Sequence, residues 1–232
     1  MNKSKVFFLF ILFIAFGFLG FLITNGVKGL FSTNDISAPP PDTGQIQQRN
    51  FLIVHVDDLQ SEDTQLVSIW AIFFFPSDPP SLTMKELYPH PYQNEDDMAI
   101  QDSFEVTTNG ELNNKLIKKL NTYQINWSGY ILIDHLSVLH ITNWLQMAGM
   151  PESLEQAIQI PGTYVQAADE EKWFDQICTQ VENEDLQNLQ HVPWTTLIPD
   201  HMHTNLYFDD MVTFWDTLAR SQIPPHCEVL VP

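Results

Sequence analysis

Three aspartates are the first residues of this sequence whose spacing could place them in one chemical site. Asp57 and Asp63 follow the apolar run 51–56, and Asp78 follows the longer apolar run 65–75. Carboxylate oxygens suit Mg²⁺, which uses few protein carboxylates and keeps several waters. The three acids therefore indicate either a site that binds a cation and a charged substrate, or an active site that has lost half its parts.

The elements that would position these acids form an alternating pattern. The apolar runs 51–56 and 65–75 are rich in β-branched and aromatic residues on both faces, which is typical of interior strands in a covered sheet. Helices and strands alternate further along, so the sequence predicts an α/β domain with a layered sheet and helices on both faces. We expect helices over 109–125, 135–150, 164–189 and 208–222, strands over 128–134 and 226–232, and irregular structure over 76–105.

A different kind of segment precedes the domain. Residues 6–24 carry no charge, and roughly 19 residues of helix just cross a hydrocarbon core of about 30 Å. No small-residue cleavage pattern follows. We expect residues 1–28 to be a cytoplasmic tail and a transmembrane signal anchor, 29–49 a Pro-rich linker, and 50–232 an extracytoplasmic domain. Lys3 and Lys5 before the span, against Lys28 after it, favour a single-pass cell-membrane protein with a cytoplasmic N-terminus.

The charge of the chain limits its partners. Its formal net charge is −19 over 232 residues, and every acidic residue lies from Asp35 onward. Such a field repels nucleic acid, so we expect no nucleic-acid partner. An extracytoplasmic location permits a disulfide between Cys178 and Cys227, the two cysteines. Two unpaired buried thiols remain an equal alternative.

Several segments, taken in order, resemble the LytR-CpsA-Psr (LCP) family of envelope proteins. In that family a strand ends in a Gly-x-Asp-x-Arg-like turn, Arg-x-Asp-Thr opens the next strand, and that strand closes on Pro-Arg-Asp. Here HVDDL stands at the first position, SEDTQLVSI at the second and FFPSDP at the third. GYILIDHLSVLHITNWLQMAGM, GTYVQA and HTNLYFDDMVTFWDTLA resemble its later segments, so the similarity runs from about residue 50 to 220.

The resemblance implies a function as well as an LCP-like fold. Members of the family are thought to transfer phosphate-linked glycopolymers from a polyprenyl-pyrophosphate carrier to the cell wall. That chemistry requires a divalent cation on carboxylates, arginines that clamp the phosphates, and an apolar groove for the prenyl tail. On this resemblance we expect Asp57 and Asp63 to be metal ligands, with Mg²⁺ as the cofactor, and Asp78 to be a catalytic carboxylate.

The arginines of the family pattern are absent. Leu59, Ser61 and Ser77 stand where the turns would carry them, and Gln166 and Ala168 where the Tyr-Val-Arg segment would. Removing one donor to a transition state typically costs about 10²–10³ in rate. We therefore expect a non-catalytic, membrane-anchored envelope module that binds a polyprenyl lipid or a glycopolymer. The alternatives are a divergent active phosphotransferase and a purely structural anchored domain.

The histidines offer weaker signals. His201 and His203 could supply two imidazoles, but the spacing shows no third metal ligand, and a surface or core role is the better interpretation. His135 and His140 are five positions apart on a predicted helix and do not share a face well. We expect both to be ordinary structural residues.

Overall fold

A computed structural model describes residues 48–90, 95–160, 162–183 and 194–230 of the chain. The predicted tail, membrane span and most of the predicted linker lie outside these residues. Within the described part, no helix combines the length and the apolar character that a membrane crossing needs.

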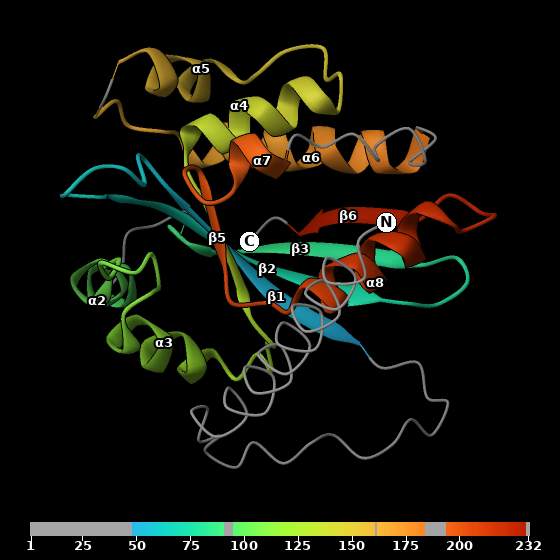
Figure 1. The fold of residues 1–232 in the computed structure, drawn as a ribbon, viewed down its shortest axis with the longest axis horizontal. Coiled ribbons are helices and arrows are strands. Elements are labelled where there is room, and N and C mark those ends of the chain that lie inside the picture. Colours follow the sequence, from blue (N-terminus) through green and yellow to red (C-terminus); the bar gives the residue numbers. More distant parts are fainter. Residues whose placement is uncertain (1–47, 91–94, 161, 184–193, 231–232) are drawn as a thin grey trace, which may run out of the picture. The chain divides into compact units, whose positions relative to one another are not determined.

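The core of the domain is a mixed six-stranded sheet (Figure 1). In the described residues the strand order is β5-β4-β1-β2-β3-β6. β1 pairs antiparallel with β2 and parallel with β4, while β3 pairs antiparallel with β2 and parallel with β6. The strands are β1 (Arg49–Val56), β2 (Leu66–Phe75), β3 (Ser81–Tyr88), β4 (Tyr130–Ile133), β5 (Met202–Thr204) and β6 (His226–Leu230).

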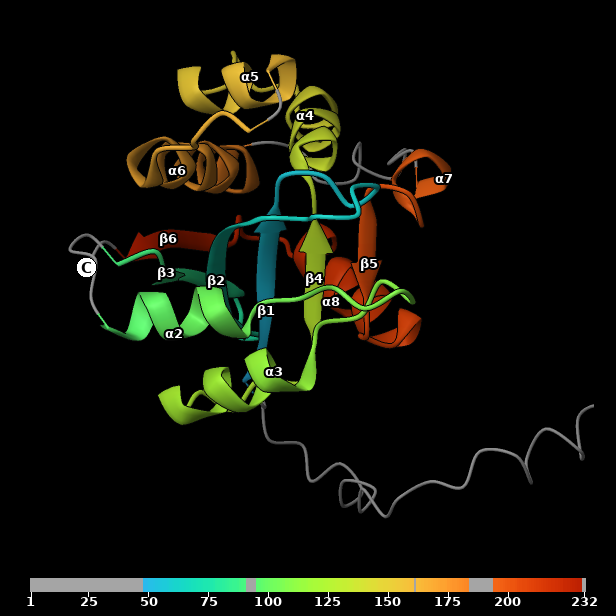
Figure 2. The same cartoon turned by 90° about the vertical axis from the view of Figure 1, so that its left-hand side faces the viewer.

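The strand directions decide which strand ends and turns lie at each end of the sheet. β1 and β4 run parallel, so both finish at the same end, where the arrows of Figure 2 point toward α4. We call this the carboxyl end of β1 and β4. β5 starts there, since Met202 pairs with Ile133, and β3 finishes there, since Tyr88 pairs with Ile69 near the start of β2. The β2–β3 turn lies at the opposite end.

Helices cover both faces of the sheet (Figures 1 and 2). One hydrophobic cluster joins the sheet to α4, α5, α6, α7 and α8, and the other joins it to α2 and α3. β1 divides between them because its side chains alternate: Leu52 and Val54 contribute to the second cluster, whereas Ile53 packs against the first. The helices are α2 (Glu95–Ser103), α3 (Asn114–Leu120) followed by the 3₁₀ turn η1 (Asn121–Tyr123), α4 (His135–Trp144), α5 (Glu152–Gln159), α6 (Ala167–Asn183), α7 (Trp194–Leu197) and α8 (Phe208–Ala219).

The prediction of irregular structure over 76–105 is wrong for most of that segment, because it contains all of β3 and α2. Leu82 and Met84 alternate with polar residues and face the first hydrophobic cluster, while Ile100 of α2 is fully buried in the second. The mixed α/β class with helices on both faces is confirmed, and the strands expected around 51–56, 65–75, 128–134 and 226–232 are present.

The two cysteines form a disulfide in the structure, which decides between the alternatives left open by the sequence. Cys178 of α6 is bonded to Cys227 of β6, 49 residues further along the chain. Both are buried in the first hydrophobic cluster. The bond therefore ties the edge strand β6 to the helix that covers it.

Candidate functional site

The structure separates the three predicted acids. Asp57 directly follows β1, and Asp63 lies in the turn before β2, so both belong to the carboxyl end of β1 and β4. Asp78 lies in the β2–β3 turn, at the other end of the sheet. The physical reason is the antiparallel hairpin: a chain that leaves one end of the sheet in β2 reaches the next turn at the opposite end. The three carboxylates therefore do not make one site.

The two predicted Mg²⁺ ligands lie in the turn between β1 and β2. One oxygen of the Asp57 carboxylate accepts hydrogen bonds from the backbone N–H groups of Asp58 and Gln65, each at 2.7 Å, and so closes the β1–β2 turn. Asp63 is exposed, and among the described residues no group of three or more His, Cys, Asp or Glu is arranged to hold a metal. A cation role for Asp57 and Asp63 stays a prediction.

The positions of the missing arginines also divide between the two ends. Leu59 and Ser61 lie in the β1–β2 turn, but Ser77 lies with Asp78 at the far end. In place of the β2–β3 turn, the end of β3 lies at the carboxyl end of β1 and β4. His90 follows β3 by two residues. The His90 Nδ1 is 2.7 Å from the Asp97 carboxylate, so this segment brings an imidazole and an acid rather than a guanidinium.

Both arginines and one candidate lysine of the described part are held in ion pairs. The two arginines of the chain make surface ion pairs, Arg49 with Asp210 at 2.8 Å and Arg220 with Asp216 at 2.9 Å. Lys172, which could have replaced an arginine, is exposed and pairs with Asp169 at 2.8 Å. No arginine is therefore available at the carboxyl end of β1 and β4 to hold phosphate oxygens.

A buried chain of polar side chains lies at this end instead. His55, the next-to-last residue of β1, points toward α6, where its Nδ1 hydrogen-bonds the Glu170 carboxylate. Its Nε2 lies 2.9 Å from Nδ1 of His135, the first residue of α4. His55 is 1% exposed, Glu170 2% and His135 6%, so all three are removed from water. We call these residues the Glu170–His55–His135 chain.

Local sequence explains why α4 begins here. Asp134 caps the helix, and its carboxylate accepts the backbone N–H of Ser137 at 2.8 Å. The other carboxylate oxygen lies 2.8 Å from Nδ1 of His201, which stands just before β5. The backbone N–H of His135 donates to the carbonyl of Asp57 at 3.4 Å. These contacts hold the ends of β1 and β4 and the segment before β5 together.

The hydrogen bonds restrict where protons sit in the Glu170–His55–His135 chain. A carboxylate only accepts, so Nδ1 of His55 carries the proton that it shares with Glu170. Burial, followed by the neighbouring His55, lowers the pKa of His135 to about 3, so His135 is neutral. When His55 is neutral too, its Nε2 accepts from Nδ1 of His135. Nε2 of His135 is then unprotonated, but with a pKa of about 3 it is a weak proton acceptor near neutral pH.

A second acid beside this chain has an unusual pKa. Glu86 of β3 lies on the same face of the sheet as Leu82 and Met84, which pack in the cluster under α6. Burial, followed by the negative charge of Glu170, raises the pKa of Glu86 to about 7. Its Oε1 and the buried Ser68 hydroxyl have no hydrogen-bond partner in the described part of the chain. Ionisable groups with such shifts gather at functional sites.

The raised pKa of Glu86 predicts a pH dependence of stability. Between pH about 4.5 and about 7 the folded state keeps a proton that the unfolded state has released, so stability falls as pH rises through this window. The variant Glu86→Gln removes that loss. We expect it to be more stable than the parent protein at pH 8, by about 1–2 kcal/mol after allowance for solvent screening, with little difference at pH 4.5.

Urea unfolding at both pH values, followed by tryptophan fluorescence, measures the effect. Glu62→Gln is the matched control because Glu62 is exposed in the β1–β2 turn, and it should leave the pH dependence unchanged. If the stability of Glu86→Gln relative to the parent is the same at pH 4.5 and pH 8, the assignment of a raised pKa to Glu86 is wrong.

Sequence reasoning missed this group of residues and treated His135 as ordinary. The signal that could have found it is a charged or polar residue inside an apolar strand. His55 interrupts FLIVHV, and Glu86 occupies an inward position of β3.

His201 and His203 do not act as a pair, since His201 bonds Asp134 while the ring of His203 packs against Gly110. A side chain at Gly110, where φ is +76°, would collide with that ring.

Comparison with known proteins supports the resemblance at the level of the fold. No protein-family model matches the chain, and no curated protein matches its sequence. A structure of TagT bound to LIIa-WTA has a TM-score of 0.50 and 7% identity, and covers 86% of this chain and 85% of that one. This chain has an LCP-type fold. Two structures from Bacillus subtilis are also similar: the transcriptional regulator yvhJ (TM-score 0.48, 9% identity, 81% of this chain and 84% of that one) and TagV (0.46, 8%, 81% and 85%).

Proposed function

We propose that this protein is a membrane-anchored envelope module with an LCP-type fold that binds the sugar part of a polyprenyl-linked glycopolymer and does not transfer it. The anchor is the apolar segment 6–24, which would place the domain outside the cell membrane with the N-terminus in the cytoplasm. The structural similarity to TagT, which was solved bound to LIIa-WTA, supports a role in the same chemical setting.

One observation carries the non-catalytic part of this proposal. The carboxyl end of β1 and β4 holds carboxylates and the neutral imidazole of His135 where phosphoryl transfer needs fixed positive charge. Glu170 and Glu86 lie close enough for the charge of one to raise the pKa of the other, and Asp97 contributes to the same shift. A pyrophosphate brought to this end would be repelled rather than held.

The packing of the core supports sugar recognition over recognition of the prenyl tail. Large aromatic side chains fill the layer between the sheet and α6. The rings of Trp70 and Phe174 have centroids 4.4 Å apart, and Trp173 lies edge-on to Phe174 at 4.9 Å. All three are at most 2% exposed. In this layer an apolar chain would have to displace these rings, so we assign the binding to the glycan.

The full chain in liposomes tests this proposal. Soluble glycan released from a polyprenyl-linked wall polymer is added, and the fraction that sediments with the protein-bearing liposomes is measured with Mg²⁺ and with EDTA. We expect binding that is the same in both conditions, because no metal step is involved. Neutral glycans should bind better than phosphate-rich ones, since the chain has a net charge of −19.

Failure to sediment any glycan in either condition contradicts the proposal and leaves a structural domain as the better account. Binding that needs Mg²⁺ contradicts the assignment of the site to sugar recognition. Empty liposomes give the background in both cases.

A divergent active transferase is the second candidate function, and one observation favours it. The Glu170–His55–His135 chain ends in a neutral imidazole that could accept a proton from an attacking hydroxyl. With a pKa of about 3 that group is a weak base, and it supplies no stabilisation of phosphate charge, which is usually the larger contribution. The non-catalytic function is therefore preferred.

A further inference from the structure

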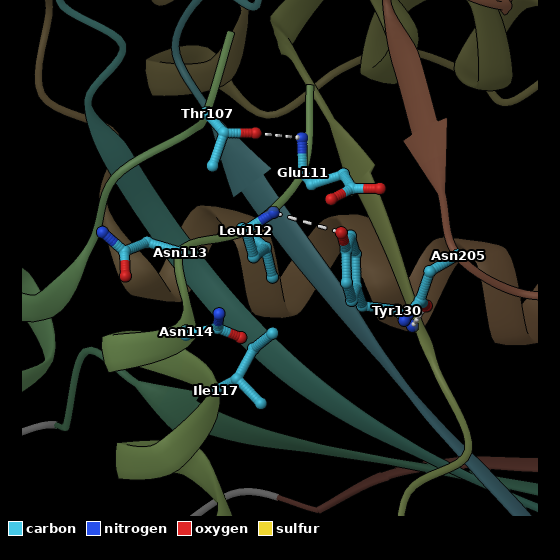
Figure 3. A pocket seen from close by; sticks show the side chains of 8 residues that line it. All are labelled: Thr107, Glu111, Leu112, Asn113, Asn114, Ile117, Tyr130 and Asn205. Carbon is cyan, nitrogen blue, oxygen red and sulfur yellow. Dashed lines mark hydrogen bonds between the residues drawn. The ribbon is translucent and has the colours of Figure 1, made fainter. Parts of the chain in front are cut away.

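A polar cavity lies at the other end of β4, away from the Glu170–His55–His135 chain. It has a volume of about 340 Å³, within the range of small-molecule sites. Three segments that are distant in sequence line it: residues 107–117, which run from a turn into α3, the start of β4 at Tyr130, and Asn205 after β5. Figure 3 shows these residues around the Tyr130 ring.

The floor of the cavity is apolar and fixed. Leu112 and the Tyr130 ring are buried, and Ile117 of α3 adds a third apolar side chain. The Tyr130 hydroxyl accepts the backbone N–H of Leu112 at 3.1 Å, so the ring is held against the segment before α3 (Figure 3). The Asn205 Oδ1 accepts the backbone N–H of Tyr130 at 2.7 Å, which fixes the amide at the rim.

Polar groups with unused hydrogen-bonding capacity surround this floor. Asn205 uses only its oxygen in the contact with Tyr130, so its NH₂ group is left to donate. Within the part of the chain that the structure describes, the Glu111 carboxylate and the Asn114 amide make no hydrogen bond. In Figure 3, Glu111 lies above the Tyr130–Leu112 pair, Asn205 beside Tyr130 and Asn114 below Leu112. Donors and acceptors thus border the apolar floor.

We propose that this cavity binds a neutral saccharide of one or two units. A carboxylate and two amides match the paired donor and acceptor character of sugar hydroxyls, while the floor takes the C–H face of the ring. Glu111 and the net charge of −19 disfavour phosphate and other anions. The inference rests on the proposed function only for the origin of the saccharide, a wall glycopolymer. The cavity itself is separate from the carboxyl end of β1 and β4.

The test uses the full chain in a detergent without a sugar headgroup. Saturation-transfer NMR is recorded with N-acetylglucosamine, its β-1,4-linked dimer, glycerol and inorganic phosphate. We expect signal for the two saccharides, with a Kd below about 10 mM for the dimer, and none for glycerol or phosphate. The double variant Glu111→Ala/Asn114→Ala should weaken dimer binding at least tenfold, with the melting temperature unchanged because both side chains are exposed.

The matched control is Glu62→Ala/Asn143→Ala, which removes an exposed glutamate and an exposed asparagine away from the cavity. It should bind the dimer as the parent does. Equal binding by both double variants, or no saccharide signal up to 10 mM, overturns the inference. A cavity variant that binds monosaccharide poorly but still sediments glycopolymer overturns only the link to the proposed function. If the parent protein binds the saccharides but sediments no glycopolymer, only the proposed function is contradicted.

Discussion

Replacing His55 by alanine is expected to lower the free energy of unfolding by about 3–5 kcal/mol, because it leaves the Glu170 carboxylate buried without its partner. The side chains of His55 and Glu170 are 2% and 3% exposed, so water cannot take over the lost hydrogen bond. His135 loses its contact to His55 in the same variant. Urea unfolding of the parent and the variant at pH 7 gives the difference directly.

His226→Ala is the matched control because it also removes an imidazole from a glutamate. His226 and Glu182 are 3.2 Å apart, but their side chains are 65% and 38% exposed. The control should cost less than about 1 kcal/mol. Equal losses in the two variants would falsify the claim that burial makes the Glu170–His55–His135 chain important for stability.

Reduction of the disulfide should have an effect of similar size. A bond that closes a loop of 49 residues is expected to stabilise the fold by about 4 kcal/mol, chiefly by restricting the unfolded chain. For a domain of this size the loss corresponds to a fall in melting temperature of about 10 °C. Differential scanning fluorimetry with and without dithiothreitol measures it. β6 should separate first, since it is an edge strand bonded to the sheet only through β3 in the described residues.

The double variant Cys178→Ala/Cys227→Ala provides the control for the reductant. Its melting temperature should match that of the reduced parent and should not respond to dithiothreitol, because these are the two cysteines of the chain. A reduced parent that melts within about 2 °C of the oxidised form would contradict a structural role for the bond.

The sequence predicts the central strands and the long helices because their patterns are local. FLIVHV and LVSIWAIFFF are apolar on both faces, and the observed β1 and β2 cover both faces of a buried sheet. α2 was missed for a local reason as well. Its buried positions are Ile100 and the acidic Asp97, so it has almost no apolar periodicity to detect.

The candidate site could not be assembled from spacing in the same way. His55 and Glu170 are 115 residues apart, and only the packing of α6 over β1 brings them into contact. Asp57 and Asp78 are much closer in sequence, yet a single antiparallel strand, β2, carries them to opposite ends of the sheet. Separation along the sequence therefore does not predict which of these residues meet, because strand direction and helix packing decide it.

A single-turnover assay distinguishes glycan binding without phosphoryl transfer, as we propose, from transfer. The full chain in liposomes is mixed with a polyprenyl-pyrophosphate-linked glycan, Mg²⁺ and a wall acceptor, and the release of polyprenyl phosphate is followed. We expect release no faster than in protein-free liposomes. Release above that background, lost in a His135→Ala variant shown to be folded, would establish that the protein is a transferase.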